Sequence, residues 1–488
     1  MPKHPTASGA MPSLRGSALW LSFAAATTGT LMVNIDATAV NVALPVMQRE
    51  FALPIAALQW VVTSYLLVIT GVLPLTGQVA DLVGRKRLFV LGIGAFTLGS
   101  VLAALSSGFL PLVGARMLQG IGGAIIQANV MAIVVLTFPI EGRGKALGMI
   151  GSVVAAGTLA GPPIGGLLTA LYGWPSIFWV NLPIGVWGIW ASWRYLPAFP
   201  RDHGLSLRRL DWFGAGLFLA ATTLLQFGLS NLHQVVGLWL LLLTALAMAV
   251  FIRHERSAAR PVMPLRLFAI APFWRNMVAG MAYWLLMMAP SLLMPFYLRL
   301  VLREPIAVVG LSLIPQALGM IVVSPFGGQL VDRLGVLLPG RVGLALFMVS
   351  DAALALLPAN PPLWAVMLIL LAIGTASGLY NAPNNTAVLN SVPAKDTGLA
   401  SSLLAVQRNL GRSVGVAVAS IELSIFWILA GIGPAPSHTS ASYPAVFLLG
   451  FRGVFWSGLL FGAIGILMMQ APQRPEEEQR AEAAAARS

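Results

Sequence analysis

The sequence contains no cysteine, and only 9% of its 488 residues are charged, whereas a soluble protein would carry about a quarter. The missing cysteine excludes disulfides, thiol catalysis and cysteine-ligated metals. No phosphate-binding loop or ATPase signature is present, and the histidines are scattered over expected tails and loops: His4, His203, His233, His254 and His438. We therefore expect no enzyme activity, no metal site and no cofactor, so that the energy for any work must come from an ion gradient.

Apolar residues are abundant instead, at 58% of the chain. They come in blocks of roughly 20, enough to cross a hydrocarbon layer of about 30 Å. The net charge of +13 could suggest nucleic acid, but most cations fall in alternate loops between the blocks, as the positive-inside rule requires. The block 18–45 is too long for a signal peptide and should stay as a transmembrane helix. The sequence thus predicts an all-α integral membrane protein whose partner is the lipid bilayer and not nucleic acid.

Fourteen transmembrane spans are expected. The first eight cover 18–45, 58–76, 88–107, 110–138, 146–171, 176–193, 212–230 and 237–252. The other six cover 272–298, 306–326, 341–357, 363–385, 398–430 and 446–469. One set of alternate loops carries most of the cations, whereas the opposite set holds only Arg49, Arg299 and Arg303. Both termini are therefore expected in the cytoplasm.

Two features of the sequence recur at nearly the same distance. The stretch Gly77–Arg87 (G-Q-V-A-D-L-V-G-R-K-R) has a partial copy at Gly328–Gly335 (G-Q-L-V-D-R-L-G), 251 residues later. Both are expected to be loops. Glycines spaced four apart from Gly157 are matched 254 residues later by Gly411, Gly415 and Ala419. This repetition predicts two homologous six-span bundles. The expected units are a tail at 1–17, a bundle at 18–193, linkers with two extra helices at 194–271, a bundle at 272–469 and a cytoplasmic tail at 470–488.

Together with this duplication, a set of motifs occurs in one order along the chain. They are I-D-A-T-A-V-N-V-A-L-P at 35–45, R-M-L-Q-G-I-G-G-A at 116–124, G-P-P-I-G-G at 161–166, I-F-W-V-N-L-P-I-G at 177–185, L-D-W-F-G at 210–214 and R-N-L-G-R-S-V-G-V-A at 408–417. The chain resembles the major facilitator superfamily, and within it the fourteen-span drug:H⁺ antiporter branch of the EmrB/QacA type. That resemblance implies the major facilitator fold, proton coupling and drug export.

Asp36 and Arg116 are the candidate proton-coupling residues. A carboxylate inside the bilayer costs roughly 2.5–3.5 kcal/mol on insertion scales, so a function is the default reading. A carboxyl can be charged or neutral, as proton exchange requires, although a structural hydrogen bond would also explain Asp36. Arg116, whose motif the resemblance associates with proton coupling, needs a partner, and Asp36 is one candidate; a structural role for Arg116 stays open. The repeat offset places Met287 and Met367 at the matching positions, so proton handling is assigned mainly to the first bundle.

The candidate substrate-binding residues are aromatic, methionine, amide and acidic side chains within the spans. They are Asn34, Tyr65, Gln119, Tyr283, Trp284, Met287, Tyr380, Asn381, Asp351 and Glu422. Aromatic and methionine faces suit varied lipophilic molecules, although ordinary packing would explain many of them. Asp351 and Glu422 could attract cations, or could pair with arginines. Asn34, Thr38 and Asn41 share one helix face and Asp36 points elsewhere, so either set faces the pathway while the other joins helices. The helix around Pro383 is expected to be broken.

The candidate gating residues are Gly77, Asp81, Gly84, Arg85, Asp332, Arg333, Gly157, Gly161, Pro162 and Gly165. By resemblance, Asp81 would clasp a neighbouring helix end and hold the cytoplasmic side shut. The glycines of 157–165 form a flat stripe that lets another helix approach closely, and the prolines beside them are expected to bend the span. Simple helix packing is the alternative reading.

The resulting hypothesis is a proton-driven multidrug efflux antiporter in the bacterial cytoplasmic membrane. It would export lipophilic, in one version cationic, compounds by alternating access. The first alternative is a dedicated metabolite exporter or an uptake symporter of the same fold. The second is a non-transporting membrane sensor or assembly protein. A monomer is expected, and a periplasmic adaptor partner stays open.

Overall fold

The computed structural model describes residues 17–138, 140–199, 211–232, 234–258, 263, 265–393, 396–434, 436, 440 and 442–471. Most of the two expected terminal tails, residues 200–210 of the expected linker and several loop cations lie outside these residues. Every regular element in the described ranges is helical. The first half contains α1 (Ser17–Phe51), α2 (Ile55–Leu58), α3 (Trp60–Val83), α4 (Arg85–Ala104), α5 (Phe109–Thr137), α6 (Ile140–Tyr172), α7 (Ser176–Trp179) and α8 (Asn181–Tyr195).

A pair of helices follows, α9 (Trp212–Ser230) and α10 (Val235–Ser257). The second half begins with a short 3₁₀ helix, η2 (Leu265–Ala269), and the long helix α11 (Ala271–Phe296), which a π-helical turn, η3 (Tyr297–Val301), extends. It continues with α12 (Ile306–Ser312), α13 (Ile314–Leu334), α14 (Leu337–Ala355), α15 (Leu363–Leu389), α16 (Thr397–Leu429) and α17 (Tyr443–Met468).

In the described residues, 13 helical segments are long and apolar enough to cross a membrane. The chain is therefore a multi-pass membrane protein, as its composition predicts. The sixth expected span, 176–193, corresponds to α7 and the 15-residue α8, which packs against α1 and α4. The tenth expected span is divided into α12 and α13 and extends to Leu334.

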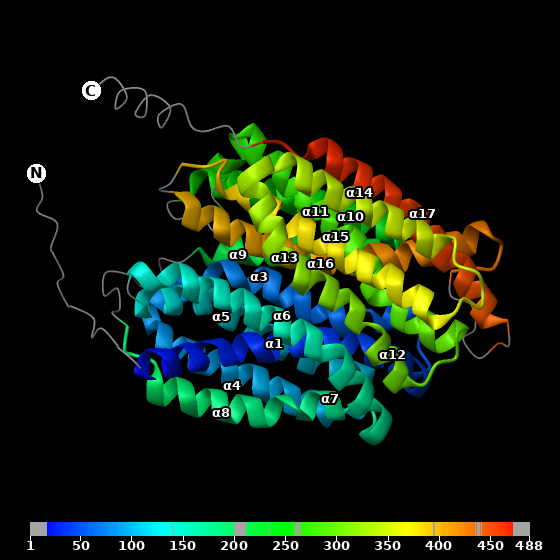
Figure 1. Cartoon of the computed structure of the whole chain (residues 1–488), viewed down its shortest axis with the longest axis horizontal. Helices are drawn as coiled ribbons and strands as arrows, with labels where there is room; N and C mark the ends of the chain where they lie inside the picture. Colours follow the sequence, from blue (N-terminus) through cyan, green and yellow to red (C-terminus); the bar gives the residue numbers. More distant parts are fainter. Residues whose placement is uncertain are drawn as a thin grey trace, which may run out of the picture.

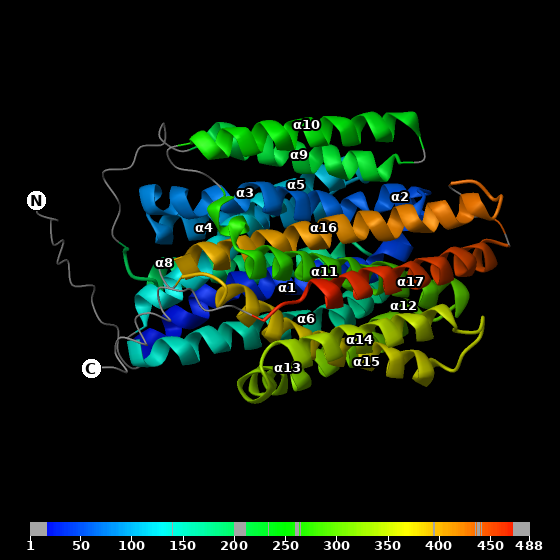
Figure 2. The same ribbon diagram turned by 90° about the horizontal axis from the view of Figure 1, so that it is seen from above.

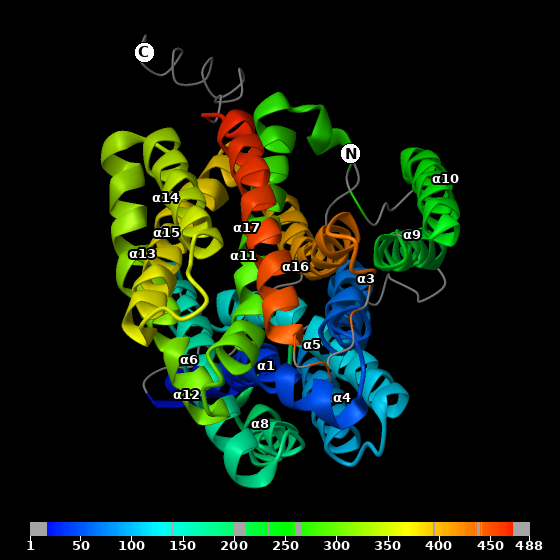
Figure 3. The same cartoon turned by 90° about the vertical axis from the view of Figure 1, so that its right-hand side faces the viewer.

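The same helix pairings occur in both halves of the chain. In the first half α1 packs on α6, α3 on α5 and α4 on α5. In the second half α11 packs on α16, α13 on α15 and α14 on α15. Seen along the helices, the two groups lie side by side as separate bundles (Figure 3), and we refer to them as the N bundle and the C bundle. The pairings are those that a duplicated sequence would produce.

Glycines bring the paired helices into contact. A Cβ on Gly157 would meet the Cβ of Asn34 at 2.9 Å, and one on Gly161 would collide with the hydroxyl of Thr38. In the C bundle, a Cβ on Gly415 would lie 2.8 Å from the carbonyl oxygen of Trp284. The glycine stripe of α6 thus lets α1 approach closely, and the stripe of α16 does the same for α11.

The helices α9 and α10 lie outside both bundles (Figures 2 and 3). They pack on each other, and α9 contacts α3 and α16. Gln226 of α9 donates hydrogen bonds of 2.8 Å to the carbonyl and hydroxyl oxygens of Ser413. Most of α10 is exposed and apolar, which suits contact with lipid. The pair therefore flanks the line where the two bundles meet.

Several contacts between the bundles lie toward one end of the molecule. We call it the distal end, the end at which α1 finishes at Phe51 (Figure 1). Asn41 of α1 donates to the hydroxyl of Ser291 in α11 at 2.9 Å. Gln48 donates to the hydroxyl of Tyr443 at 3.3 Å. A Cβ on Gly166 of α6 would lie 2.8 Å from the carbonyl oxygen of Ile306 in α12. Polar bonds and close backbone packing thus join the bundles at the distal end.

Two expectations about local structure are wrong. Gly77–Val83 is not a loop but the end of α3, and α4 starts at Arg85, so only Gly84 interrupts the helices. Gly84 has φ 98° and Gly335, in the copy, has φ 74°, a conformation that glycine adopts without a Cβ penalty. Asp81 therefore belongs to the last turn of a helix, and its side chain lies outside the described part of the structure.

The helix at Pro383 is not broken either, because α15 runs without interruption from Leu363 to Leu389. A proline removes one backbone donor and crowds one carbonyl, and neighbouring transmembrane helices can compensate for this loss. Pro383 is buried against such neighbours. Pro162 and Pro163 are likewise contained within the continuous helix α6.

Candidate functional site

A buried polar cluster lies inside the N bundle, centred on the carboxylate of Asp36. Arg116 of α5 donates to Asp36 Oδ2 at 2.5 Å. Gln119 of α5 and Asn181 of α8 donate to Oδ1 at 3.2 and 3.1 Å. None of these four side chains is more than 1% exposed. The contact expected between Asp36 and Arg116 is thus present.

Arg116 forms further hydrogen bonds and ring contacts besides its ion pair with Asp36. Its Nε donates to the carbonyl oxygen of Val61 at 2.9 Å, and its Nη1 also donates to Gln119 Oε1 at 2.7 Å. The guanidinium lies 4.3 Å from the ring centroid of Tyr65 in α3 and 5.8 Å from that of Phe178 in α7. Gln119 in turn donates to the hydroxyl of Ser100 in α4 at 2.7 Å. The cluster therefore connects α1, α3, α4, α5, α7 and α8.

Small residues allow these helices to approach. A Cβ on Gly99 of α4 would lie 2.7 Å from the backbone nitrogen of Gln119. A Cβ on Gly120 of α5 would lie 2.8 Å from the carbonyl oxygen of Tyr65. The polar side chains can reach each other only because the backbones are this close. The glycine-rich sequence that follows Arg116 thus builds the cluster as well as the helix packing.

A second cluster, made of aromatic, amide and methionine side chains, lies in the C bundle. The rings of Tyr283 and Tyr380 stack with centroids 4.6 Å apart, and Tyr283 meets Trp284 edge-on at 5.0 Å. Asn381 donates to the hydroxyl of Tyr283 at 3.2 Å. The sulfur of Met287 accepts hydrogen bonds from Ser377 and Gln316 at 3.6 and 3.7 Å. Five of the predicted substrate-binding residues are thus neighbours, although their role in binding stays a prediction.

The other candidates are distributed differently. Tyr65 and Gln119 belong to the Asp36 cluster, and Asn34 donates to the carbonyl oxygen of Thr30 while it packs on Gly157. Asn41 crosses to the C bundle. On α1, the asparagine face thus joins α1 to α6 and α11, whereas Asp36 faces the polar cluster.

Asp351 and Glu422 face α17, within the C bundle. Asp351 is 1% exposed, and its Oδ2 lies 2.7 Å from the position of a Cβ on Gly458. Neither of its oxygens has a hydrogen-bond partner in the described structure. Glu422 is partly buried on α16 and lies within electrostatic reach of Asp351. Within the described residues neither acid forms an ion pair with an arginine, and their role in selecting substrate stays a prediction.

The candidate gating residues lie at helix ends and along α6. Gly84 separates α3 from α4, and Arg85 is partly buried at the start of α4. Asp332 and Arg333 are exposed in the last turn of α13. Gly157, Gly161 and Gly165 contact α1, which bears out their packing. The gating role itself stays a prediction.

Several residues of the clusters were not predicted from the sequence. Asn181 lies within the motif at 177–185 but carries no signal of its own role, and Ser100 lies in an ordinary apolar span. Arg412, whose guanidinium lies 4.6 Å from the ring centroid of Trp284, belongs to the motif at 408–417 but is not among the predicted site residues. Two arginines one turn apart within a span were the signal that could have identified it.

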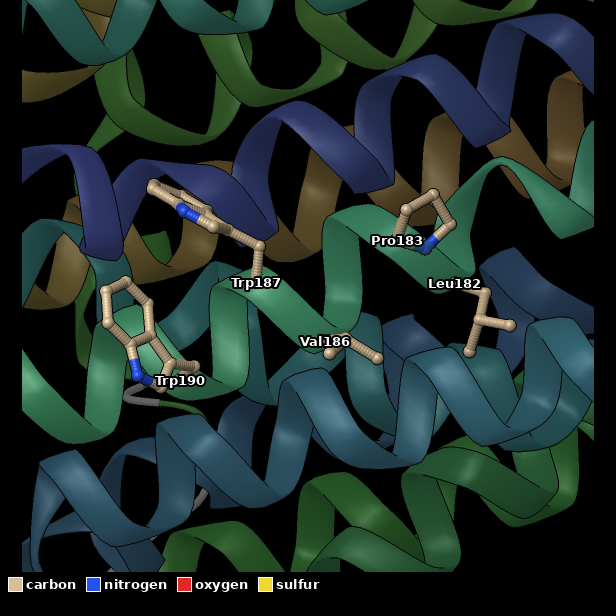
Figure 4. A pocket seen from close by; sticks show the side chains of 5 residues that line it. All are labelled: Leu182, Pro183, Val186, Trp187 and Trp190. Atoms are coloured by element: carbon tan, nitrogen blue, oxygen red, sulfur yellow. The ribbon is translucent and has the colours of Figure 1, made fainter.

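A hollow on the surface of α8 has a different character. Figure 4 shows the side chains that line it, all from this one helix: Leu182, Pro183, Val186, Trp187 and Trp190. Val186 and both tryptophans are exposed. An exposed and wholly apolar lining suits lipid contact, so the transport pathway is better sought between the two bundles.

Two bundles with repeated helix pairings, joined at the distal end and carrying buried polar and aromatic clusters, are the architecture of a membrane transporter. A family model described as Major Facilitator Superfamily matches residues 26–416. The chain belongs to this superfamily.

Known proteins similar to the chain are transporters and resistance proteins. The chain is 32% identical over 401 residues to the riboflavin transporter RibZ of Clostridioides difficile, covering 82% of this chain and 87% of that protein. It is 32% identical over 424 residues to the multidrug resistance protein Stp of Mycobacterium tuberculosis, covering 85% and 77%.

Among solved structures, the fold resembles a bacterial homolog of the human lysosomal transporter Spinster in an inward-facing and unoccupied conformation. The TM-score is 0.67 at 16% identity, over 93% of this chain and 98% of that chain.

Proposed function

We propose that the protein is a proton-driven efflux antiporter of the fourteen-span drug:H⁺ branch, which exports lipophilic compounds of more than one kind. The Asp36 cluster is the observation that carries this proposal. An ion pair of a buried aspartate and a buried arginine, both 1% exposed, is expensive to maintain inside a membrane and is usually functional when it occurs. The similarity to the multidrug resistance protein Stp supports the choice of cargo.

The cluster offers a way to couple protons to motion. In the structure, Asp36 accepts three hydrogen bonds and donates none. A proton on Asp36 would neutralise the partner of Arg116, and a buried charge that loses its partner is destabilised by about 3–5 kcal/mol. Arg116 must then find other partners, and its remaining neighbours are Gln119 on its own helix and residues of α3 and α7. Protonation would thus favour a different arrangement of the N bundle.

Alternating access is supported by the distribution of contacts between the bundles. The bonds Asn41–Ser291 and Gln48–Tyr443 join the bundles at the distal end. The loop cations predict that this end faces away from the cytoplasm. The structure would then represent a state closed to the outside, and the outward-open state would require these bonds to break.

The cargo is better described as lipophilic than as cationic. The cluster of Tyr283, Tyr380 and Met287 provides aromatic and thioether surfaces. Such surfaces adapt to varied apolar molecules. A cationic cargo would need a carboxylate facing it, whereas Asp351 packs against Gly458 of α17.

The decisive experiment is transport by the purified protein in liposomes with an imposed pH gradient. With the wild-type protein, each of several dissimilar lipophilic drugs should dissipate the imposed pH gradient by driving proton flux. Asp36→Asn should abolish this proton flux while leaving drug binding measurable. A single active compound would favour the dedicated exporter. Proton and drug moving in the same direction would favour the symporter, and no flux for any compound would favour a sensor. If Asp36→Asn kept full pH-driven exchange, the proposed coupling site would be wrong.

A further inference from the structure

Two arginines near the middle of α16 have no acidic partner among the described residues. Arg412 is one residue from the midpoint of this 33-residue helix, and Arg408 precedes it by one turn on the same side. Both are partly accessible rather than buried. In the described part of the chain neither forms an ion pair or a hydrogen bond to a side chain or carbonyl. This differs from Arg116, which has partners on every side.

The surroundings of Arg412 belong to both bundles. Its guanidinium lies 4.6 Å from the ring centroid of Trp284, and Trp284 contacts Tyr283. One turn before Arg412, Asn409 donates to Gln127 of the N bundle at 3.2 Å. Arg412 is also within electrostatic reach of Tyr65, whose ring covers Arg116. It therefore lies where the polar cluster of one bundle faces the aromatic cluster of the other.

The intramembrane acids are engaged elsewhere or lie too far away. Asp36 is saturated by three donors in the N bundle. Asp351 faces Gly458 of α17. Glu422 follows Arg412 by ten residues, or about 15 Å along the helix axis. The space between the bundles thus carries a net positive charge, and an intramembrane arginine calls for an anionic or polar partner.

We propose that Arg412 binds an acidic oxygen of the cargo and that the positive charge of Arg408, one turn away, strengthens this attraction. The aromatic cluster then receives the apolar part of the cargo. The predicted substrate class is the amphipathic aromatic acid, with a carboxylate or comparably acidic group on a planar ring system. A guanidinium offers paired donors to a carboxylate, and Trp284, Tyr283 and Tyr380 offer ring faces beside it. The inference rests on the proposed export function and names its substrate class.

Three probes with one aromatic body test the class directly: 1-pyrenebutyrate, its methyl ester and 4-(1-pyrenyl)butylamine, which are anionic, neutral and cationic. Binding to the purified full chain is measured by fluorescence, and transport is measured in liposomes with a pH gradient. The variants are Arg412→Gln and Arg412→Lys. Arg452→Gln is the matched control, because Arg452 is an arginine of α17 that donates to the carbonyl oxygen of Leu357 at 2.7 Å.

The wild type should bind the anion at least about ten-fold more tightly than the ester, as the loss of a charged hydrogen bond would predict. Arg412→Gln should remove this preference, Arg412→Lys should restore part of it, and Arg452→Gln should keep it. Any of four results would overturn the inference. The wild type could bind the three probes equally, prefer the amine, or bind none of them. Arg412→Gln could also weaken the binding of all three probes by the same factor. Anion binding without any proton-linked transport would instead contradict the export function and leave the anion site standing.

Discussion

The phenol ring of Tyr65 covers the guanidinium of Arg116, with 4.3 Å between the guanidinium carbon and the ring centroid. Tyr65 is 1% exposed, and its hydroxyl has no hydrogen-bond partner in the described structure. The ring, rather than the hydroxyl, is therefore the part that contacts the Asp36–Arg116 pair. Tyr65 is also within electrostatic reach of Arg412.

Tyr65→Phe should consequently leave proton-coupled transport within about two-fold of wild type, because the ring face remains. Tyr65→Leu should reduce it by about thirty-fold, since a cation–π contact at a desolvated site contributes around 2 kcal/mol. Initial rates of drug-induced proton release in liposomes would measure both effects. A loss in Tyr65→Phe as large as in Tyr65→Leu would show that the hydroxyl matters and that this argument is wrong.

The Asp36–Arg116 ion pair predicts a non-additive pattern of stability. Asp36→Asn should destabilise the protein by about 3–5 kcal/mol, because Arg116 is then buried without an anion. Arg116→Gln should cost a similar amount, and the double variant should recover much of the loss. Thermal unfolding in detergent, followed by size-exclusion chromatography, measures the three values. Additive losses would mean that the two side chains are not energetically paired.

The glycine stripe of α6 offers a matched pair of substitutions. Gly161→Ala would push a methyl group into the hydroxyl of Thr38, whereas a Cβ on Gly151 of the same helix meets nothing within 4 Å. Gly161→Ala should therefore cost about 1–3 kcal/mol by overpacking. Gly151→Ala should be neutral or slightly stabilising, because alanine favours helix. Similar melting temperatures for both variants would contradict the close contact of α6 with α1.

The absence of cysteine makes the distal contact easy to test. Asn41→Cys and Ser291→Cys replace two side chains that are hydrogen-bonded at 2.9 Å across the bundles. A short thiol cross-linker should join them and stop transport, because alternating access requires this contact to open. Reduction of a cleavable linker should restore the flux, and each single-cysteine variant should be unaffected. Full transport by the cross-linked protein would exclude separation of the bundles at this point.

An anionic cargo has an electrical signature. Exchange of one proton moving inward for one monoanion moving outward transfers two charges, and each gains about 2.3 kcal/mol from 100 mV. Transport of 1-pyrenebutyrate should therefore produce larger currents per molecule on a solid-supported membrane than transport of the neutral ester. One-for-one exchange of the protonated amine should be electrically silent. Equal currents for anion and ester would contradict this stoichiometry.

The sequence predicted the large features well, because membrane helices depend on apolar length and on helix packing by small residues. The helical pattern and the approach of Gly157 and Gly161 to α1 follow directly from composition and spacing. The contact between Asp36 and Arg116 could also be anticipated, because two opposite charges inside a membrane must find partners.

Local backbone and the finer polar contacts were less predictable. Gly77–Val83 looked like a loop, since its glycine and charged residues are typical of loops, yet the helix continues until Gly84 with its positive φ. Ser100 and Asn181 join the Asp36 cluster only because four other helices bring them together. Such side-chain contacts depend on tertiary packing, and no single segment of the sequence encodes them.

Met287 occupies the position in the C bundle that the repeat offset assigns to Asp36, and its sulfur receives weak hydrogen bonds from Ser377 and Gln316. Under the proposed function, one half of the duplicated sequence would carry the proton-coupling acid and the other half a soft, adaptable binding surface. Substrate specificity could then change independently of proton coupling. Laboratory selection for resistance to new compounds should enrich changes in α11, α13, α15 and α16, while α1 and α5, which carry Asp36 and Arg116, remain constant.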